Sequence, residues 1–274
     1  MMKTGFIGVG HMGGAILKSY ASSSAGKEDR ILICDQNRQL AEKRQEEMPQ
    51  LSMTDSIGGL VGASEVIIIG VKPQGMEPVL EQVAEKYRPT KLIISMAAGI
   101  SIDYIRGFLG EDARVIRIMP NTPAMVGEAM IAVCRKEPVG GEDLELARRV
   151  LGPAGRTEGV EESLIDCVIG VSGSSPAYTY MYIEGLVHAA QANGMDREQA
   201  RVFAAQAVLG AAKMVLQSPE SLEQLRINVC SPGGTTIEAV HALQKNGFMD
   251  DIAEGFQAAV DRSIEMTKEK QKHD

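Results

Sequence analysis

The chain has 274 residues, with 36 acidic against 28 basic side chains and a formal net charge of −8. This length suits one large domain or two modest ones, and the acidic balance argues against a broad nucleic-acid surface. No apolar run reaches the roughly 20 residues of a membrane span, and no signal-peptide pattern is found. The four cysteines are far apart without a C-x-x-C pair, so we expect a cytoplasmic protein without a metal centre.

The first part of the chain alternates short apolar runs with helical patterns. The runs predict strands over residues 4–9, 30–34, 66–71, 92–96, 114–119 and 130–134. The segments between them predict helices that include residues 13–23, 38–47, 76–86 and 102–108. Nearly continuous apolar strands are typical of a parallel sheet that is covered on both faces. Residues 1–162 are therefore expected to form a Rossmann-like, doubly wound α/β domain.

Strand patterns stop after about residue 162. Helical patterns follow over residues 176–193, 196–217, 222–229, 235–246 and 250–270. The first of them, and residues 202–215 within the second, have almost no charged face, and a helix that is apolar all round must be buried on every side. Roughly 110 residues can hardly enclose two such helices, so residues 163–274 are expected to form an all-α dimerisation domain that is completed by a second copy.

A glycine-rich turn follows the first strand directly and opens the first helix. It reads Gly8-Val9-Gly10-His11-Met12-Gly13, and an acidic residue, Asp35, stands 22 positions after the last glycine. In a G-x-G-x-x-G turn the glycines allow the tight bend and the close approach of a pyrophosphate to the helix N-terminus. The context of strand, turn and helix therefore predicts a dinucleotide site.

The residues after the second strand leave the choice of coenzyme open. Asp35 could accept hydrogen bonds from the adenosine ribose, which would favour NAD(H). Arg38, together with Asn37, could instead pair with a 2′-phosphate, which would favour NADP(H).

Three more turns are expected at the edge of the sheet that carries the glycines. They read Gly70-Val71-Lys72-Pro73 and Ala97-Ala98-Gly99, and a third, Met119-Pro120-Asn121-Thr122-Pro123, closes the next strand. Each alone could be an ordinary strand-end turn. Ligands of open α/β sheets bind at the carboxyl ends of the strands, so together the three turns indicate a cofactor cleft.

A second candidate site lies in the helical half, at Ser231-Pro232-Gly233-Gly234-Thr235-Thr236. Thr235 and Glu238 have the spacing of a capping box, and Gly247 stands where the helix should end. A helix start that faces a glycine loop presents free N–H groups to a small carboxylate or phosphate. The alternative is an ordinary capped helix after a turn.

With a further segment, Gly170-Val171-Ser172-Gly173-Ser174-Ser175-Pro176-Ala177-Tyr178, these motifs resemble pyrroline-5-carboxylate reductase in order and spacing over about residues 4–265. The resemblance implies that Δ1-pyrroline-5-carboxylate is reduced to L-proline, the last step of proline biosynthesis. NADP(H) is the expected coenzyme, with NAD(H) as the alternative. It also implies a helical domain that interlocks with a partner, in a homodimer that can assemble further into a decamer.

The resemblance also assigns roles to individual residues. The substrate carboxylate is expected on Ser231, Gly234, Thr235 and Thr236, with Thr236 beside the ring nitrogen as the catalytic residue. Glu162 matches a substrate-contacting position and Asn228 a cofactor-contacting one. Their alternative interpretations are a helix N-terminal carboxylate for Glu162 and a turn residue for Asn228.

The sequence departs from the family pattern at two places that bear on coenzyme preference. His11 stands where many members carry asparagine. Near Asp55 and Ser56 many members also place an asparagine that contacts the adenosine end.

Two other functions are weighed against a reductase. A β-hydroxyacid dehydrogenase would need a lysine on the first helices after the sheet domain to handle the alcohol proton, and residues 170–194 contain none. A nucleotide-sensing paralogue without catalysis would have less need of the intact loop at residues 231–236.

Overall fold

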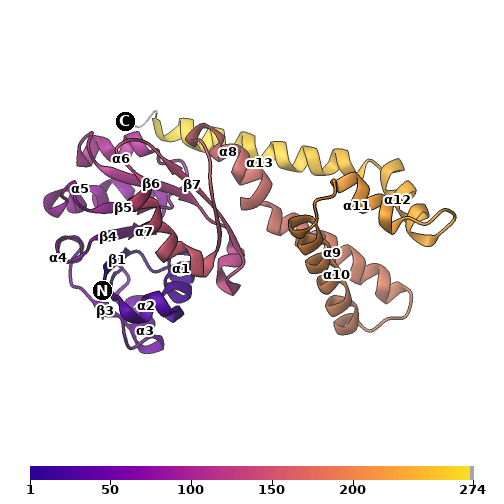
Figure 1. Cartoon of the computed structure of the whole chain (residues 1–274), viewed down its shortest axis with the longest axis horizontal. Coiled ribbons are helices and arrows are strands. Elements are labelled where there is room, and N and C mark those ends of the chain that lie inside the picture. Colours follow the sequence, from indigo (N-terminus) through magenta and orange to yellow (C-terminus); the bar gives the residue numbers. More distant parts are fainter. Residues whose placement is uncertain (272–274) are drawn as a thin grey trace. The chain divides into compact units, whose positions relative to one another are not determined.

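The computed structural model describes residues 1–271, the last three of them as backbone alone. Two compact units make up the chain (Figure 1). Met1–Gly173 together with residues 259–271 form the first, and Ser174–Ala258 form the second. The domain boundary expected between residues 162 and 163 stays a prediction, because compactness does not tell which segment folds on its own. Residues 272–274 of the expected second domain lie outside the described part.

An eight-stranded sheet, with the order β3-β2-β1-β4-β5-β6-β7-β8, forms the centre of the first unit. Its strands are β1 (Lys3–Ile7), β2 (Arg30–Cys34), β3 (Ser52–Met53), β4 (Val66–Ile69), β5 (Leu92–Ser95), β6 (Arg114–Met119), β7 (Ala129–Arg135) and β8 (Gly155–Gly159). Strands β1 to β6 run parallel, which confirms the predicted parallel sheet. Strand β7 runs antiparallel to β6, because the short link between them holds no crossover helix, which a parallel pair would require.

Helices cover both faces of this sheet. They are α1 (His11–Ser22), α2 (Ser24–Glu28), α3 (Arg38–Glu47), α4 (Ile57–Ala63), α5 (Met76–Lys86), α6 (Ile102–Leu109), α7 (Gly141–Leu151) and α8 (Ile165–Val168), followed by a π-helical segment, Ile169–Gly173. Helices α1, α3 and α7 pack on one hydrophobic cluster, and α4, α5 and α6 on the other (Figure 1). Neighbours Phe6 and Ile7 on β1 enter opposite clusters, as expected for strands that are buried on both faces.

Helices make up the second unit. They are α9 (Ser175–Ala192), α10 (Arg197–Gln217), α11 (Leu222–Val229), α12 (Thr235–Lys245) and the first part of α13 (Phe248–Gln271). The side chains of Asp196 and Ser221 cap α10 and α11 by accepting bonds from the N–H groups of Gln199 and Gln224. These caps begin both helices close to the residues that the sequence predicts.

The second unit leaves many large apolar side chains uncovered. Met181 on α9 is 70% exposed, and Phe203 and Leu216 on α10 are 64% and 68% exposed. The buried cluster between α9 and α10 contains only Val187, Ala200 and Ala204 at its centre. One chain therefore leaves the two apolar helices largely uncovered. This agrees with the expectation from the sequence that a single chain cannot enclose them. Within residues 1–271, no helix has both the length and the apolar character needed to cross a membrane.

Gly155 at the start of β8 gives a test of the fold. Its φ is +152°, and a Cβ there would overlap the backbone of Ala129. We expect Gly155→Ala to lower the free energy of unfolding by about 2 kcal/mol or more, because backbone strain and a clash add. Urea titration at a fixed protein concentration measures the effect.

The matched control is Gly159→Ala, at the other end of β8. Gly159 is exposed, its φ is not positive, and nothing lies within 4 Å of the added Cβ. This variant should be neutral or slightly stabilising. Equal losses in both variants would contradict the steric argument.

Candidate functional site

Four parallel strands, β1, β4, β5 and β6, end at one edge of the sheet. The loops after them carry the glycine turn, residues 70–73, residues 97–99 and the turn at Asn121. The sequence analysis places its coenzyme site at this edge, and the structure brings the four loops to it. Ligands of open α/β sheets bind at this edge.

Three glycines of the edge pack backbone against backbone. Gly8 has a φ of +85°, and a Cβ there would lie 2.8 Å from the carbonyl oxygen of Gly70. A Cβ on Gly13 would overlap the carbonyl oxygen of Gly8, and one on Gly70 would come within 2.8 Å of the same oxygen. Gly10 differs, since nothing lies within 4 Å of its Cβ position. The fold therefore accounts for Gly8, Gly13 and Gly70, whereas Gly10 keeps open the space that a pyrophosphate needs.

Helix α1 starts at this open space. Its N-cap is Gly10, which has no side chain to accept a bond from the first-turn N–H groups, and the first turn contains no acidic residue. His11 is exposed and Met12 is half-buried against the first cluster. An uncapped helix N-terminus with free N–H groups and a positive dipole end favours an anion. The glycine turn therefore fits a dinucleotide pyrophosphate.

Asp35, at the end of β2, holds the glycine turn in place. Its Oδ2 accepts a hydrogen bond from Val9 N at 2.8 Å, and its Oδ1 accepts one from Asn37 N at 2.8 Å. The side chain of Asn37 caps α3 by accepting from Leu40 N at 3.2 Å. Both carboxylate oxygens of Asp35 thus already bind backbone donors, and Asn37 has a structural role as well.

Arg38 is the positively charged residue that lies nearest to Asp35 along the chain. Its guanidinium, with a side chain 70% exposed, pairs with Glu42 at 3.0 Å and with Asp55 at 3.4 Å. An exposed pair of this kind contributes little to stability and can exchange partners. Arg38 is therefore free to meet an anionic group.

The other two cofactor turns have small or rigid residues at the same edge. Val71 packs against the second cluster, and Lys72 precedes a 3₁₀ turn, Pro73–Gly75. In the next loop Ala97 is buried. Gly99 has a φ of +72°, a value that residues other than glycine rarely adopt. Ala98 lies between them, half-buried. Both loops offer backbone and little side chain to a flat ligand.

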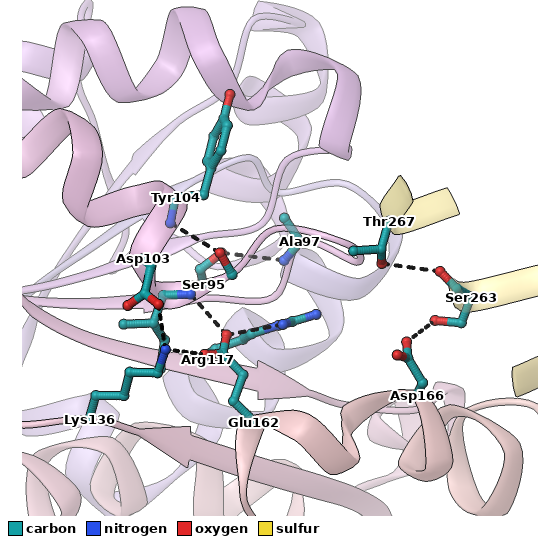
Figure 2. A network of polar contacts seen from close by, with 12 residues as sticks. Ser95, Ala97, Asp103, Tyr104, Arg117, Lys136, Glu162, Asp166, Ser263 and Thr267 are labelled. Carbon is teal, nitrogen blue, oxygen red and sulfur yellow. Dashed lines mark hydrogen bonds and ion pairs between the residues drawn. The ribbon is translucent and has the colours of Figure 1, made fainter. Parts of the chain in front are cut away.

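A network of charged side chains lies behind the loop at residues 97–101 (Figure 2). Glu162 Oε1 accepts bonds from Arg117 Nη1 at 3.0 Å and from Ile102 N at 2.9 Å. Glu162 Oε2 pairs with Lys136 Nζ at 3.1 Å, and Lys136 also pairs with Asp103 at 2.7 Å. Burial disfavours the charged form of Glu162, yet these donors hold the pKa of its carboxyl below the ordinary value. The carboxylate therefore stays ionised inside the unit.

This placement bears on the expected role of Glu162. It occupies the position of a carboxylate at a helix N-terminus, since Ile102 is the first residue of α6. A substrate contact of Glu162 stays a prediction. Arg117 was not found from the sequence, although an arginine inside the otherwise apolar run of residues 114–119 is a signal, because a buried charge needs a partner.

Asn121, which the sequence analysis names only as part of a turn, makes two specific side-chain bonds. Its Nδ2 donates to the carbonyl oxygen of Ser172 at 3.0 Å, and its Oδ1 accepts from Met130 N at 2.9 Å. It is buried, so both bonds are made away from water. Asn121 thus ties the end of β6 to β7 and to the π-helical segment.

The loop at residues 231–236 lies in the second unit and differs from the prediction in its cap. Gly234, and not Thr235, is the N-cap of α12, and no side chain caps the helix. The expected capping box with Glu238 is therefore wrong. The reason is a turn in which Gly233 takes a φ of +68° and Gly234 N donates to the carbonyl oxygen of Ser231 at 2.9 Å. The helix itself begins at Thr235, as the sequence analysis predicts.

An uncapped start leaves the first-turn N–H groups of α12 without a side-chain acceptor from Gly234, which favours the anion-site interpretation. Thr235 is exposed and Thr236 is half-buried. The predicted stop is confirmed, since α12 ends at Lys245 and Gly247 has a φ of +78°.

Asn228 lies in the last turn of α11 and not in a turn between helices. Its Nδ2 donates to Glu220 at 2.9 Å, and its Oδ1 accepts from Gln224 at 2.7 Å. These bonds orient the amide within the second unit. A contact with the coenzyme stays a prediction.

The chain matches known protein families and individual relatives. The family model described as pyrroline-5-carboxylate reductase dimerisation matches residues 162–266, and one described as NADP oxidoreductase, coenzyme F420-dependent, matches residues 3–99. The pyrroline-5-carboxylate reductase of Escherichia coli K12 is 38% identical over 97% of this chain and 98% of its own length. That of Pisum sativum is 36% identical, over 96% and 95%.

Solved structures give the same result. A pyrroline-5-carboxylate reductase from Coxiella burnetii superposes with a TM-score of 0.89 at 30% identity, over 96% of this chain and 98% of its own. A Plasmodium falciparum pyrroline carboxylate reductase with NADP bound reaches 0.83 at 28% identity, over 97% and 98%.

The lowered pKa of Glu162 predicts a pH-dependent stability. A carboxyl with a depressed folded pKa stabilises above its unfolded value, 4.5, and loses that contribution as pH falls through the folded pKa. At pH 7 we expect Glu162→Gln to lower the free energy of unfolding by about 1–3 kcal/mol. The difference from wild type should shrink on acidification below pH 4.5, as measured by urea titration.

The control for this prediction is Glu158→Gln. Glu158 is 51% exposed and pairs with Arg156 at 2.6 Å. Its loss should change the free energy of unfolding by less than about 1 kcal/mol at either pH. A Glu162→Gln effect that is constant with pH would refute the assignment.

The open space at Gly10 gives a test of the pyrophosphate seat. We expect Gly10→Ala to keep the melting temperature and to weaken NADPH binding about tenfold or more, equal to about 1.4 kcal/mol. The added methyl enters space that the chain itself does not use. Fluorescence titration with NADPH measures binding.

Gly62→Ala serves as its control, since it also adds a methyl in open space, near the end of α4. It should leave binding unchanged. Unchanged binding in Gly10→Ala as well would rule out the proposed seat.

Proposed function

The chain belongs to the pyrroline-5-carboxylate reductase family, and from it we propose which of its residues hold the coenzyme and the substrate. The protein is an oxidoreductase that acts on a cyclic C=N bond with a nicotinamide coenzyme. It reduces Δ1-pyrroline-5-carboxylate to L-proline, the last step of proline biosynthesis. One observation supports the residue assignment. Helices α1 and α12 both have a glycine as N-cap, Gly10 and Gly234, so no side chain caps either helix.

The first unit is the proposed coenzyme holder. Residues 8–13 would bind the pyrophosphate at the start of α1, because Gly10 leaves open space there. Asp35, Asn37 and Arg38 would meet the adenosine end, and residues 70–73 and 97–99 the nicotinamide end. Asn228 is carried over from the family as a further contact. When bound, the coenzyme supplies the hydride.

The second unit is the proposed substrate holder. The substrate has one carboxylate, and the uncapped start of α12 offers backbone N–H groups to it. Ser231, Gly234, Thr235 and Thr236 are the residues proposed for this contact. Glu162 is carried over from the family as a candidate contact, although its carboxylate already binds three donors within the first unit.

Positioning is the main contribution that these residues can make. A cyclic imine that binds already protonated needs no strong acid from the protein, so orientation of the reacting carbon accounts for much of the rate. The hydroxyl of Thr236 would hydrogen-bond the ring nitrogen or hold a water beside it. The backbone N–H groups of the loop would fix the carboxylate end of the ring.

Loss of NAD(P)H absorbance with Δ1-pyrroline-5-carboxylate as substrate tests the function. Turnover with this imine is the expected result. Turnover with a β-hydroxyacid instead would favour a dehydrogenase, and binding of coenzyme without turnover of either would favour a nucleotide sensor.

We propose a homodimer as the smallest functional assembly, and further assembly into a decamer. The uncovered side chains of α9 and α10 support the dimer, because apolar surface of that extent is typical of an obligate interface. Light scattering after size exclusion measures the mass. A cytoplasmic location is part of the same proposal, and it is tested by fractionation.

Thr236 is the proposed catalytic residue, and its hydroxyl can be removed alone. We expect Thr236→Ala to lower kcat about 3- to 10-fold, the loss of one hydrogen bond, with coenzyme affinity unchanged. Thr236→Ser keeps the hydroxyl and should retain most of the rate. Loss of NADPH affinity in Thr236→Ala would count against the assignment.

NADPH is the proposed preferred coenzyme, because Arg38 is exposed and both oxygens of Asp35 already bind backbone donors. We expect Arg38→Ala to raise the KM for NADPH about tenfold, an amount typical of one lost charged hydrogen bond, and to leave the KM for NADH nearly unchanged. Steady-state kinetics with both coenzymes measure this.

Arg148→Ala is the matched control, since Arg148 is also exposed and pairs with an acidic neighbour, Glu145. It should change neither KM. Equal effects of Arg38→Ala on both coenzymes would contradict the role.

A further inference from the structure

The loop at residues 97–101 is held at both of its ends by polar side chains of the first unit. At its start, Ser95 Oγ accepts from Ala97 N at 3.4 Å. At its end, Ile102 N donates to Glu162 Oε1 at 2.9 Å, and Ser101 Oγ accepts from Tyr104 N at 3.0 Å. Figure 2 shows the bond between Ser95 and Ala97 and the contacts of Glu162 with Arg117 and Lys136.

Among these bonds, only the one to Glu162 joins the loop to a residue that is distant in the sequence. Glu162 comes 60 residues after Ile102 and is fixed in turn by Arg117. Arg117 lies on β6 directly beside Ser95 of β5 in the register of the sheet. Both ends of the loop are therefore tied, through two neighbouring strands, to one rigid part of the sheet.

The ion pair of Glu162 and Arg117 fixes the position of the loop more than it adds to the stability of the fold. The side chains of Glu162 and Arg117 are 13% and 9% exposed. A buried ion pair gains little net stability over apolar packing, because desolvation offsets the attraction. The same pair fixes position well, since Oε1 receives Arg117 and the first N–H of α6 together. Gly99, with its φ of +72°, gives the loop backbone freedom that such an anchor limits.

We propose that Glu162 is a positioning residue for the nicotinamide end of the coenzyme, acting through Ile102 N and Arg117 on the loop at residues 97–101. The inference rests on the proposed role of this loop in coenzyme binding. It is a role separate from the substrate contact that the family resemblance suggests for Glu162. All three donors to its carboxylate come from the first unit, two of them on Oε1 and one on Oε2.

The two roles predict different kinetics. A substrate contact acts on the KM for Δ1-pyrroline-5-carboxylate. A positioning residue acts on coenzyme affinity and on kcat, because small displacements of a positioned reactant lower the rate by up to about 100-fold. The variants are Glu162→Gln, Arg117→Lys and the double variant, assayed at neutral pH below their unfolding temperatures.

We expect Glu162→Gln to weaken NADPH binding and to lower kcat, each about tenfold. Arg117→Lys should show the same pattern more weakly, because it keeps the charge and loses the planar geometry. The double variant should be no worse than Glu162→Gln, since the two act as one unit. Amide hydrogen exchange at residues 97–106 should rise in each variant.

Lys136→Gln is the internal control. Lys136 binds the other oxygen, Oε2, and is 38% exposed, so its loss leaves the bonds to Oε1 in place. Coenzyme affinity, kcat and exchange in the loop should stay near wild type.

Several results would overturn the proposal. They are a raised KM for the imine with unchanged NADPH affinity, wild-type behaviour of Glu162→Gln, or failure of both single variants to fold, which would make the pair a folding element. If the wild-type protein binds NADPH without reducing the imine, the proposed function fails. Weaker NADPH binding and faster exchange in Glu162→Gln would then still support the positioning role.

Discussion

Close approach of backbone to backbone at the carboxyl edge of the sheet is the constraint on which the proposed coenzyme site depends. The turn after β1, the end of β4 and the first turn of α1 meet where Gly8, Gly13 and Gly70 have no side chains. Any Cβ at these positions would push α1 away from the strands. Their absence lets the positive end of α1 reach the edge where the loops after the parallel strands gather. Asp35 completes the arrangement by binding Val9 N from the neighbouring strand.

The second unit follows a different constraint. Helices α9 and α10 are apolar on most sides, and the chain covers only a small part of them. A helix of this kind is stable in water only when another surface covers it. The match of residues 162–266 to a dimerisation family agrees with this reading. The apolar helices are therefore consistent with a role in assembly.

The buried carboxylate of Glu162 in the first unit is compensated by charged and N–H donors. Glu162, Arg117 and Lys136 concentrate three charges behind one loop, and the pKa of Glu162 is held low despite burial. Burial also raises the pKa of the Cys134 thiol, which lies beside Arg117 in the sheet, to about 11. That thiol stays neutral and behaves as an apolar residue of the second cluster.

Local pattern in the sequence was enough to predict the apolar strands, the long helices, the glycine turn and the uncovered helices of the second half. Each of these depends on residues that are close along the chain, such as the continuous apolar run of β4 or the glycine spacing after β1. Elements with weak local signals were missed, among them β3, with two residues, and β8, which has no apolar run. The cap of α12 at Gly234 and the direction of β7 depend on short local segments, the turn from Ser231 to Gly234 and the link between β6 and β7. Tertiary structure alone decided the two partners of Glu162 Oε1. Those partners lie 45 and 60 residues away, and only the folding of the sheet brings such distant groups within hydrogen-bond distance.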